Sequence, residues 1–171
     1  MRAAILVKKL RWLLLALGLA VAMRHWVWMP ALISGESMQP TLRHGQLVGI
    51  NILAYRLDRP RRGEIVGVKT ASGLMIKRVL GVPGEHIALR NGIFYVNGVR
   101  LAEPYVQFRD MGTIGDGFLG PNHFVLAGDN RSKTIIAVVN GDRILGRVRR
   151  QQPATQVSVA RKNLGSLSRR G

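Results

Sequence analysis

Short apolar runs separated by turn-forming residues fill most of the chain after residue 46. Runs of this kind are typical of strands in an antiparallel sheet. Asn-Gly pairs at residues 91–92 and 97–98 stand between such runs and favour type I′ hairpin turns, because both central residues of that turn need positive φ. The pattern therefore predicts a mostly β domain with consecutive hairpins. The candidate strands are Leu47 to Ile52, Glu64 to Val68, Leu74 to Val82, Ile87 to Leu89, Ile93 to Val96, His123 to Ala127 and Arg143 to Val148.

Three segments lack the strand pattern. Arg56 to Gly63 is a basic loop that contains proline, and Gly112 to Asn122 is rich in glycine and is predicted to be a surface loop without chemistry of its own. We interpret residues 151–171 as a basic tail that can lie on anionic lipid headgroups. The basic residues of this tail are Arg161, Lys162, Arg169 and Arg170.

The N-terminal segment contains an uncharged apolar run, Trp12 to Met23. A helix of that length reaches only about 18 Å, whereas the hydrocarbon core of a membrane is ~30 Å thick, so a span must recruit Ile5 to Val7 or Trp26 to Ile33. We predict that residues 1–33 hold a basic N-terminus and a transmembrane anchor. The run is preceded by the basic residues Arg2, Lys8, Lys9 and Arg11.

Two other interpretations of this segment fit less well. A cleavable secretory signal should end in small residues, but Met23 is followed by Arg24, His25 and Trp26. A buried helix of a soluble domain should show some polar face, and the run from residue 12 to 23 has none. With an anchor, the positive-inside rule keeps the basic front in the cytoplasm and places the rest of the chain on the opposite side.

The chain carries a formal net charge of +17 and has no cysteine. Such a charge attracts nucleic acid or anionic lipid without distinguishing them. Because an anchor is predicted and no aromatic-rich basic face is visible, we expect a lipid membrane as partner and no nucleic acid. The lack of cysteine excludes disulfides, thiol nucleophiles and Cys-based metal sites, and we predict no metal and no cofactor.

The segment from Ser34 to Leu42 lies between the predicted anchor and the first candidate strand. Gly35 permits a tight backbone path and Pro40 fixes the exit, so that the Ser37 hydroxyl can be exposed and its own N–H can point at a substrate oxygen. A serine in such a loop is, on its own, more often a simple turn residue. Ser37 becomes a candidate nucleophile only with a base beside it.

Lys77 is the candidate base. It stands inside an apolar candidate strand, where burial would lower the pKa of its amine and let the neutral form accept a proton from a serine. The alternative is an edge strand in which Lys77 and Arg78 simply point to solvent. No histidine stands in a pattern that also supplies an orienting carboxylate, so a classical triad is not supported. The histidines are His25, His44, His86 and His123.

Together these segments resemble the type I signal peptidase family, which are membrane-bound Ser-Lys proteases. That family has an anchor and then four motifs in a fixed order, and this chain has the corresponding residues in the same order, from the anchor to about Val148. The resemblance implies a mostly β catalytic domain at residues 34–150, with Ser37 as nucleophile and Lys77 as general base. The four segments that carry it are Gly35 to Leu42, Gly63 to Val66, Lys77 to Val79 with Gly81 to Glu85, and Gly128 to Arg131.

Three departures from the family pattern are visible. Gly35 stands where some members have a serine that helps to bind the oxyanion, and Glu64 and Glu85 replace aspartates. After Arg131, Thr134 takes the position of the hydroxyl that orients the lysine amine. The Asp and Arg that follow it in the family fall on Ile136 and Val138, which predicts that the usual ion pair at this corner is missing and that apolar packing replaces it.

The resemblance implies a serine endopeptidase that cleaves signal peptides from exported preproteins with small residues at positions −1 and −3. A specialised branch acting on few substrates is one form of this hypothesis. It implies an integral protein of a bacterial cytoplasmic membrane or organelle inner membrane, with the catalytic domain outside the cytoplasm. The alternative is a catalytically degenerate, membrane-tethered β module, favoured by the altered corner at Ile136 and Val138. Self-cleaving repressors share Ser-Lys chemistry, but they carry a DNA-binding domain where this chain has an apolar run.

Overall fold

The computed structural model describes residues 8–18, 27–56, 58–107 and 112–150. The described strands form two antiparallel sheets, one of seven strands and one of four. In spatial order the larger sheet contains β1 (Trp28–Leu32), β2 (Leu47–Asn51), β11 (Ile144–Arg150), β3 (Ile65–Thr70), β4 (Gly73–Gly81), β9 (His123–Ala127) and β10 (Ala137–Asn140). The smaller sheet contains β7 (Val99–Arg100), β6 (Ile93–Val96), β5 (His86–Arg90) and β8 (Ile114–Phe118).

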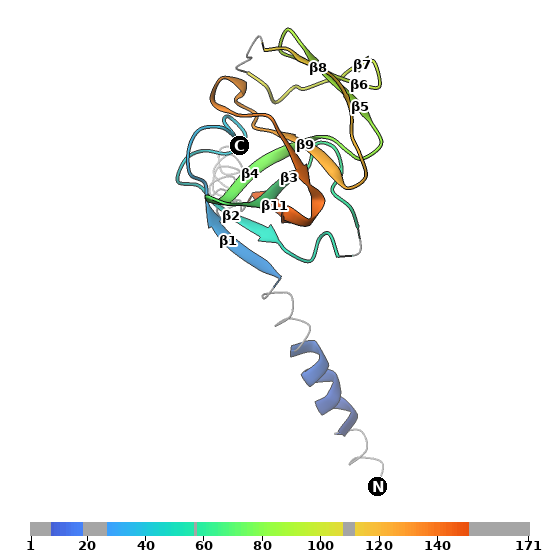
Figure 1. The fold of residues 1–171 in the computed structure, drawn as a ribbon. Coiled ribbons are helices and arrows are strands. Elements are labelled where there is room, and N and C mark those ends of the chain that lie inside the picture. Colours follow the sequence, from blue (N-terminus) through green and yellow to red (C-terminus); the bar gives the residue numbers. More distant parts are fainter. Residues whose placement is uncertain (1–7, 19–26, 57, 108–111, 151–171) are drawn as a thin grey trace, which may run out of the picture.

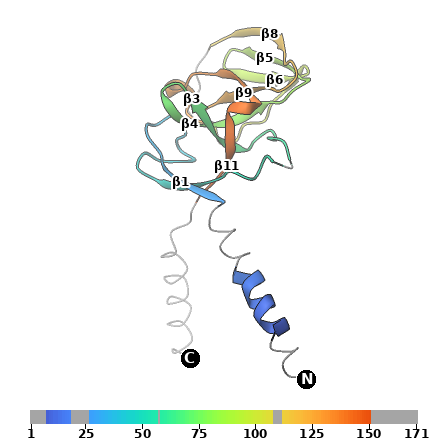
Figure 2. The ribbon, with the colours of Figure 1, turned by 60° about the horizontal axis from the view of Figure 1, so that its bottom comes forward.

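The smaller sheet lies at one end of the domain, and β1 lies at the other (Figures 1 and 2). Two short 3₁₀ helices, η1 (Arg131–Lys133) and η2 (Gly141–Arg143), flank β10. The chain enters the smaller sheet after β4 and returns from it at β9, and β9 pairs directly with β4. This pairing brings the end of β9 beside the middle of β4, which proves to be the position of the candidate site.

The predicted mostly β fold and its hairpins are confirmed. Asn91 and Asn97 have positive φ angles of 49° and 50°, and the glycine after each is also positive at 72° and 79°. The two turns join β5 to β6 and β6 to β7, as the Asn-Gly pairs predicted. The candidate strands agree with the observed ones to within one or two residues at each end.

Besides the two-residue strand β7, three strands were not predicted. Trp28–Leu32 falls inside the range assigned to the anchor, yet it forms β1 and pairs with β2 along its whole length, from Trp28 opposite Asn51 to Leu32 opposite Leu47. A short apolar run is compatible with a membrane span or with a strand, and only the partner strand decides between them. Recruitment of Trp26 to Ile33 into a span is therefore wrong for the five residues of β1.

The other two unpredicted strands are edge strands. Gly112 to Asn122 was predicted to be a loop, but Ile114–Phe118 pairs with β5 as β8, with His86 opposite Phe118. Glycine lowers strand propensity, so this strand depends on the backbone pairing that β5 offers. Ala137–Asn140 forms β10 against β9, with Val139 opposite Phe124.

The core consists of three clusters of buried side chains, and two of them share strands β4 and β9. Alternate residues of β4 and β9 pack into the larger sheet, among them Val79 and Leu126, which are both fully buried. Their neighbours Leu80 and Val125 face the smaller sheet and pack with Phe94. Strands β4 and β9 thus have both faces covered, and this makes their middle a rigid and desolvated place for a polar side chain.

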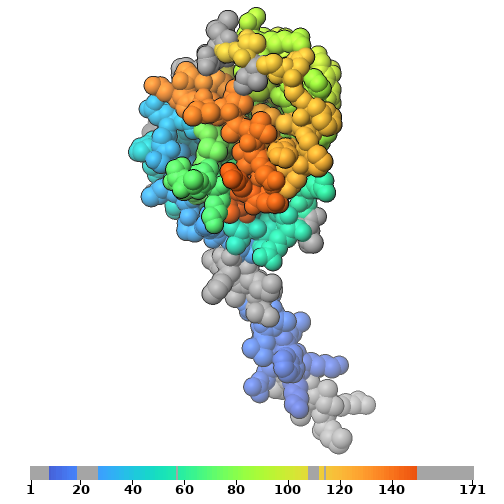
Figure 3. Space-filling view, in the orientation of Figure 1, coloured from blue at the N-terminus to red at the C-terminus, as the bar shows by residue number. Residues whose placement is uncertain are grey.

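Residues 8–18 form a helix that lies outside the body of the strands (Figure 3). Its large apolar side chains are exposed, for example Trp12 at 71% and Leu13 at 66%. Within the described ranges, no helix is both long enough and apolar enough to cross a membrane. The rest of the predicted run to Met23, and the predicted tail at 151–171, lie outside the described residues.

Candidate active site

Lys77 occupies the middle of β4, opposite Val66 of β3. Its side chain is buried, and the residue is only 6% exposed. Burial lowers the pKa of the Lys77 amine below its ordinary value, and the negative charge of Asp129 opposes this shift. The alternative of an edge strand with a solvated lysine is therefore wrong, because β4 lies between β3 and β9 in the sheet.

Ser37 lies in the loop between β1 and β2. Gly35 has a φ of 88°, a left-handed conformation that suits glycine, and its N–H donates to Nδ1 of His44 over 3.0 Å. The next side chain after Ser37, Met38, is buried at 2% exposure and anchors the loop in the core. The carbonyl oxygen of Ser37 accepts a hydrogen bond from the N–H of Asn130 over 3.0 Å. The loop is therefore fixed on both sides of Ser37.

The structure brings together all three residues that the sequence singled out. Lys77 Nζ lies 2.8 Å from Ser37 Oγ and 2.8 Å from Thr134 Oγ1. Thr134 Oγ1 also accepts the N–H of Gly128 over 3.0 Å and lies 3.3 Å from the carbonyl oxygen of Ile135, to which it donates. Because the only proton of the Thr134 hydroxyl goes to Ile135, the amine must be the donor towards Thr134. A neutral Lys77 can then direct its lone pair at Ser37.

A charged cluster flanks Lys77 on the next residue of β4. Arg78 donates from Nε to Oδ1 of Asp129 over 2.8 Å and from Nη2 to Oδ2 over 2.6 Å. Thr41 donates its hydroxyl to the same carboxylate, and Arg78 also donates to the carbonyl oxygen of Gly63 over 2.6 Å. Asp129 is fully buried. The cluster therefore ties three other segments of the chain to β4 beside the amine.

The corner after Arg131 differs from what the sequence predicted. Ile136 packs against the core cluster of the smaller sheet, as expected, but Val138 is 63% exposed and braces nothing. The corner does have a buried ion pair, which Arg131 forms with Glu103. Sequence reasoning missed Glu103. The pattern that could have revealed it is a lone acid between apolar residues, with Leu101 and Ala102 before it and Pro104 after it.

The other candidates take structural positions. Ser132 donates to the side chain of Asn130 over 2.7 Å, so the described structure assigns it no bond to Lys77. His123 bonds to the carbonyl oxygen of Pro121, and no described histidine is hydrogen-bonded to Ser37. Glu64 and Glu85 are acidic turn residues, as expected, and each accepts a backbone N–H three residues away, from Arg61 and from Val82. His25 lies outside the described residues.

The arrangement provides what is needed to activate the Ser37 hydroxyl as a nucleophile. A serine oxygen touches a desolvated amine, the amine is oriented by a second hydroxyl, and rigid strands carry the amine. Among the described residues there is no group of three or more His, Asp or Glu side chains that could hold a metal ion. The chemistry these side chains can perform on their own is proton transfer coupled to nucleophilic attack by Ser37.

Comparisons with known proteins add to this geometry. Residues 6–150 match the family model described as Signal peptidase, peptidase S26. A Signal peptidase I of Bacillus amyloliquefaciens is 32% identical over 152 residues, which cover 78% of this chain and 78% of that protein. Signal peptidase IB of Staphylococcus aureus is 31% identical over 142 residues, covering 70% of this chain and 74% of that protein. Among solved structures, a signal peptidase I from Enterococcus faecalis V583 aligns with a TM-score of 0.46 and 21% identity, over 54% of this chain and 98% of that chain.

Proposed function

This chain belongs to the signal peptidase family, peptidase S26, and we propose that it is a serine endopeptidase that cleaves signal peptides from preproteins with a Ser37–Lys77 dyad. The observation that carries the proposal is the 2.8 Å contact between Lys77 Nζ and Ser37 Oγ inside a buried strand. Relatives named Signal peptidase I, about one third identical along most of the chain, support the activity.

In the proposed mechanism Ser37 Oγ attacks the carbonyl carbon of the scissile bond while neutral Lys77 accepts the hydroxyl proton. The tetrahedral intermediate then collapses, the C–N bond breaks, and the protonated amine of Lys77 gives its proton to the leaving amine. An acyl ester on Ser37 remains. Lys77, neutral again, takes a proton from a water molecule while the water oxygen attacks the ester carbonyl. The C–Oγ bond then breaks, and Lys77 returns its proton to Ser37 Oγ, which releases the acid product and restores both residues.

The negative oxygen of the intermediate needs a hydrogen-bond donor. Gly35 has no side chain to supply one, and its own N–H is occupied by His44. The N–H of Ser37 donates no hydrogen bond to any described residue, which supports its use as the donor to the oxyanion. Thr134 supports the same step by holding the Lys77 amine through a second hydrogen bond.

The substrate is proposed to be a preprotein with small residues at positions −1 and −3. The basic front and the run from Trp12 to Met23 support an anchor in a bacterial cytoplasmic membrane or an organelle inner membrane, with residues 34–150 on the extracytoplasmic side. Residues 151–171 are proposed to be a basic tail lying on anionic lipid. A specialised branch with few substrates fits the same site.

The test is incubation of the purified full chain in detergent with a preprotein that has an Ala-x-Ala cleavage site. We expect a cut after the second alanine, and we expect Ser37→Ala and Lys77→Ala each to abolish it while the domain stays folded. Groups that act as a unit lose activity together, so the double variant should be little worse than either single variant. Failure of the unsubstituted chain to cleave would favour the second candidate, a degenerate β module, which the substitutions Ile136 and Val138 at the corner suggest.

A further inference from the structure

A buried ion pair lies next to the candidate site, and the proposed mechanism does not use it. The side chains of Arg131 and Glu103 are only 4% and 1% exposed. Both nitrogens at the end of the guanidinium donate to the carboxylate, Nη1 to Oε2 over 3.3 Å and Nη2 to Oε1. Glu103 lies in the segment after β7, and Arg131 is the first residue of η1. The pair thus joins the connection between β7 and β8 of the smaller sheet to the turn that carries Thr134.

Arg131 acts on the residues that hold the Lys77 amine. Its Nε donates to the carbonyl oxygen of Gly128 over 2.9 Å, and the N–H of the same Gly128 donates to Thr134 Oγ1 over 3.0 Å. Thr134 is also the residue at which η1 ends. The guanidinium therefore holds Gly128, whose N–H in turn holds the Thr134 hydroxyl that is bonded to Lys77.

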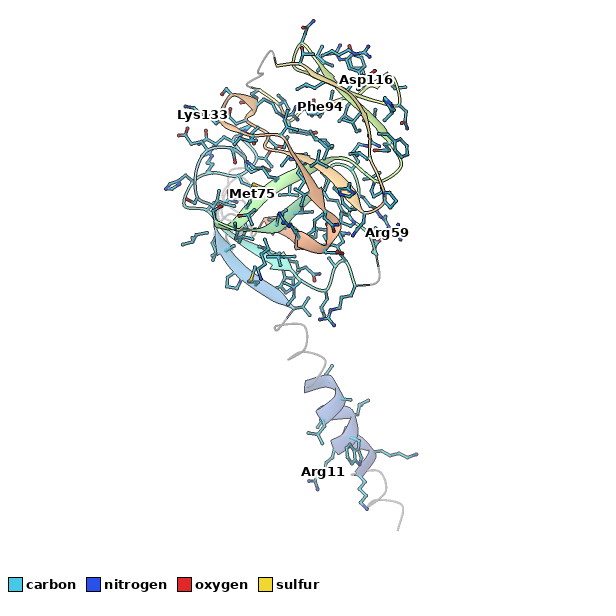
Figure 4. All side chains as sticks on the ribbon, viewed as in Figure 1. Arg11, Arg59, Met75, Phe94, Asp116 and Lys133 are labelled. Carbon is cyan, nitrogen blue, oxygen red and sulfur yellow. The ribbon has the colours of Figure 1, made fainter. Side chains whose placement is uncertain are left out.

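Glu103 also has a connection to the opposite flank of Lys77. The hydroxyl of Tyr105 donates to Oε1 of Glu103 over 3.2 Å, and the guanidinium of Arg78 lies 4.0 Å from the centre of the Tyr105 ring. The guanidinium of Arg131 lies 4.9 Å from the ring centre of Phe94, a residue of β6 that lies inside the domain (Figure 4). The Glu103 carboxylate thus contacts Arg131 directly and is connected to Arg78 through Tyr105.

A gain in folding stability does not by itself explain the buried pair of Arg131 and Glu103. Removing two charges from water costs several kcal/mol per ion, and well-packed apolar residues in their place are often neutral or stabilising. A guanidinium held in one orientation by a carboxylate does something that an apolar pair cannot do, because it points a fixed donor at the Gly128 carbonyl.

We propose that Glu103 is a positioning residue of the peptidase, which acts through Arg131 to hold Gly128 and Thr134 so that the Lys77 amine stays directed at Ser37. This inference rests on the proposed function and assigns a role to a residue outside the four motif segments. The connection between β7 and β8 is then part of what sets the rate of the reaction.

The main test is the double variant Glu103→Leu/Arg131→Met, in which apolar side chains fill the space and no buried charge is left unpaired. It should fold, with an unfolding midpoint close to that of the parent, because the exchange of a buried ion pair for apolar residues is often neutral. We expect kcat on the preprotein to fall by roughly 10- to 100-fold with KM within about two-fold, since a small misplacement of a catalytic group costs this much. Glu103→Gln should lower kcat in the same way.

A second readout does not depend on activity. Titration of the ¹³Cε signal of Lys77 by NMR should give a higher pKa in the variants than in the parent, because a loosened corner admits water to the amine. The matched control is Arg90→Gln/Asp116→Asn, which removes an exposed ion pair of the smaller sheet, 60% and 46% exposed, at the outer end of the domain (Figure 4). This control should change neither kcat nor the Lys77 titration.

A folded double variant with parental kcat and an unchanged Lys77 titration would overturn the proposal. If the double variant does not fold, Glu103→Gln decides by the same two readouts, and unfolding of both variants would assign the pair to stability and contradict the proposal. Failure of the unsubstituted chain to cleave would contradict the proposed function but not the positioning role of Glu103. The Lys77 titration would then still decide whether Glu103 positions the amine.

Discussion

Arg78 and Asp129 form a bidentate ion pair one residue away from Lys77 on β4. The Asp129 carboxylate is fully buried, and its two oxygens accept from Arg78 and from the Thr41 hydroxyl. The pair clamps the turn after β9 to β4, and it places a negative charge near the Lys77 amine. Two opposing effects therefore act on that amine, because burial lowers its pKa and Asp129 raises it, with burial the larger.

The first prediction concerns the pH dependence of cleavage. Only neutral Lys77 can accept the Ser37 proton, so kcat/KM should rise as pH rises through the folded-state pKa of Lys77. Because burial lowers this pKa, the midpoint should lie below the 10.5 of an ordinary lysine. Initial rates measured in a series of buffers at constant ionic strength check this. A rate that still climbs through pH 10.5 would contradict a desolvated base.

The same shift should affect stability. The folded-state pKa of Lys77 lies below its unfolded-state pKa. At pH values between these two pKa values the unfolded chain therefore binds more protons than the folded chain. The Lys77 contribution to the free energy of unfolding should therefore grow as pH rises through the folded-state pKa towards 10.5. Urea unfolding of the parent and of Lys77→Met across this range checks the sign. The difference between the two proteins should change in favour of the parent as pH rises.

The third prediction concerns Thr134. Thr134→Val keeps the shape and removes the oxygen that accepts from Lys77 and from the Gly128 N–H. A lost hydrogen bond to such a group is worth about 1.5 to 3 kcal/mol, so kcat should fall roughly 10- to 200-fold. Thr134→Ser should recover most of the rate. Equal rates for the valine variant and the parent would show that Thr134 does not orient the amine.

Membrane topology is the fourth prediction. The basic residues before Trp12 favour retention of the N-terminus in the cytoplasm, so the strand domain should lie on the outer face. Protease added outside intact spheroplasts, or outside the corresponding organelle membrane, should digest the domain. A cytoplasmic marker protein must stay intact in the same sample. Protection of the domain under these conditions would reverse the predicted orientation.

Ser37, Lys77 and Thr134 could be predicted from the sequence because each belongs to a local motif, or lies at a fixed distance from one. Glu103 could not be predicted, because its partner Arg131 lies 28 positions away and only the folded chain brings them together. An acid followed by proline looks like a turn residue when it is read alone. The sequence predicted that the corner lacks its ion pair, because Ile136 and Val138 stand at the family positions for the two charges. The structure has a buried pair there whose acid, Glu103, comes from another segment.

The fold shows the same division between local and long-range information. The hairpins around Asn91 and Asn97 followed from the positive φ that the turns require. Strand β1 could not be predicted in this way, because Trp28–Leu32 is apolar enough for an anchor and becomes a strand only by pairing with β2. Strand β10 was missed because its residues follow a motif and lack a turn residue in front of them.

The last prediction concerns Gly128, the residue between Arg131 and Thr134 in the network. A Cβ atom at this position would overlap the carbonyl oxygen of Ser37 and lie 2.7 Å from Thr134 Oγ1. The backbone at residue 37 cannot yield freely, because Asn130 is bonded to the same carbonyl over 3.0 Å. Gly128→Ala should therefore push apart the Ser37 loop and the Thr134 turn, which both contact Lys77.

The expected result is a loss in kcat/KM of about 100-fold or more, since the nucleophile and the base both move. The unfolding midpoint should also fall, by roughly 5 °C or more, because overpacking strains a closely packed turn. Gly117→Ala is the matched control, since a Cβ there meets no atom within 4 Å. It adds the same methyl group to an edge strand and should leave both quantities unchanged. Parental activity in Gly128→Ala would mean that the loop and the turn can separate without harm, and the close contact between Ser37 and Gly128 would then have no part in positioning the nucleophile.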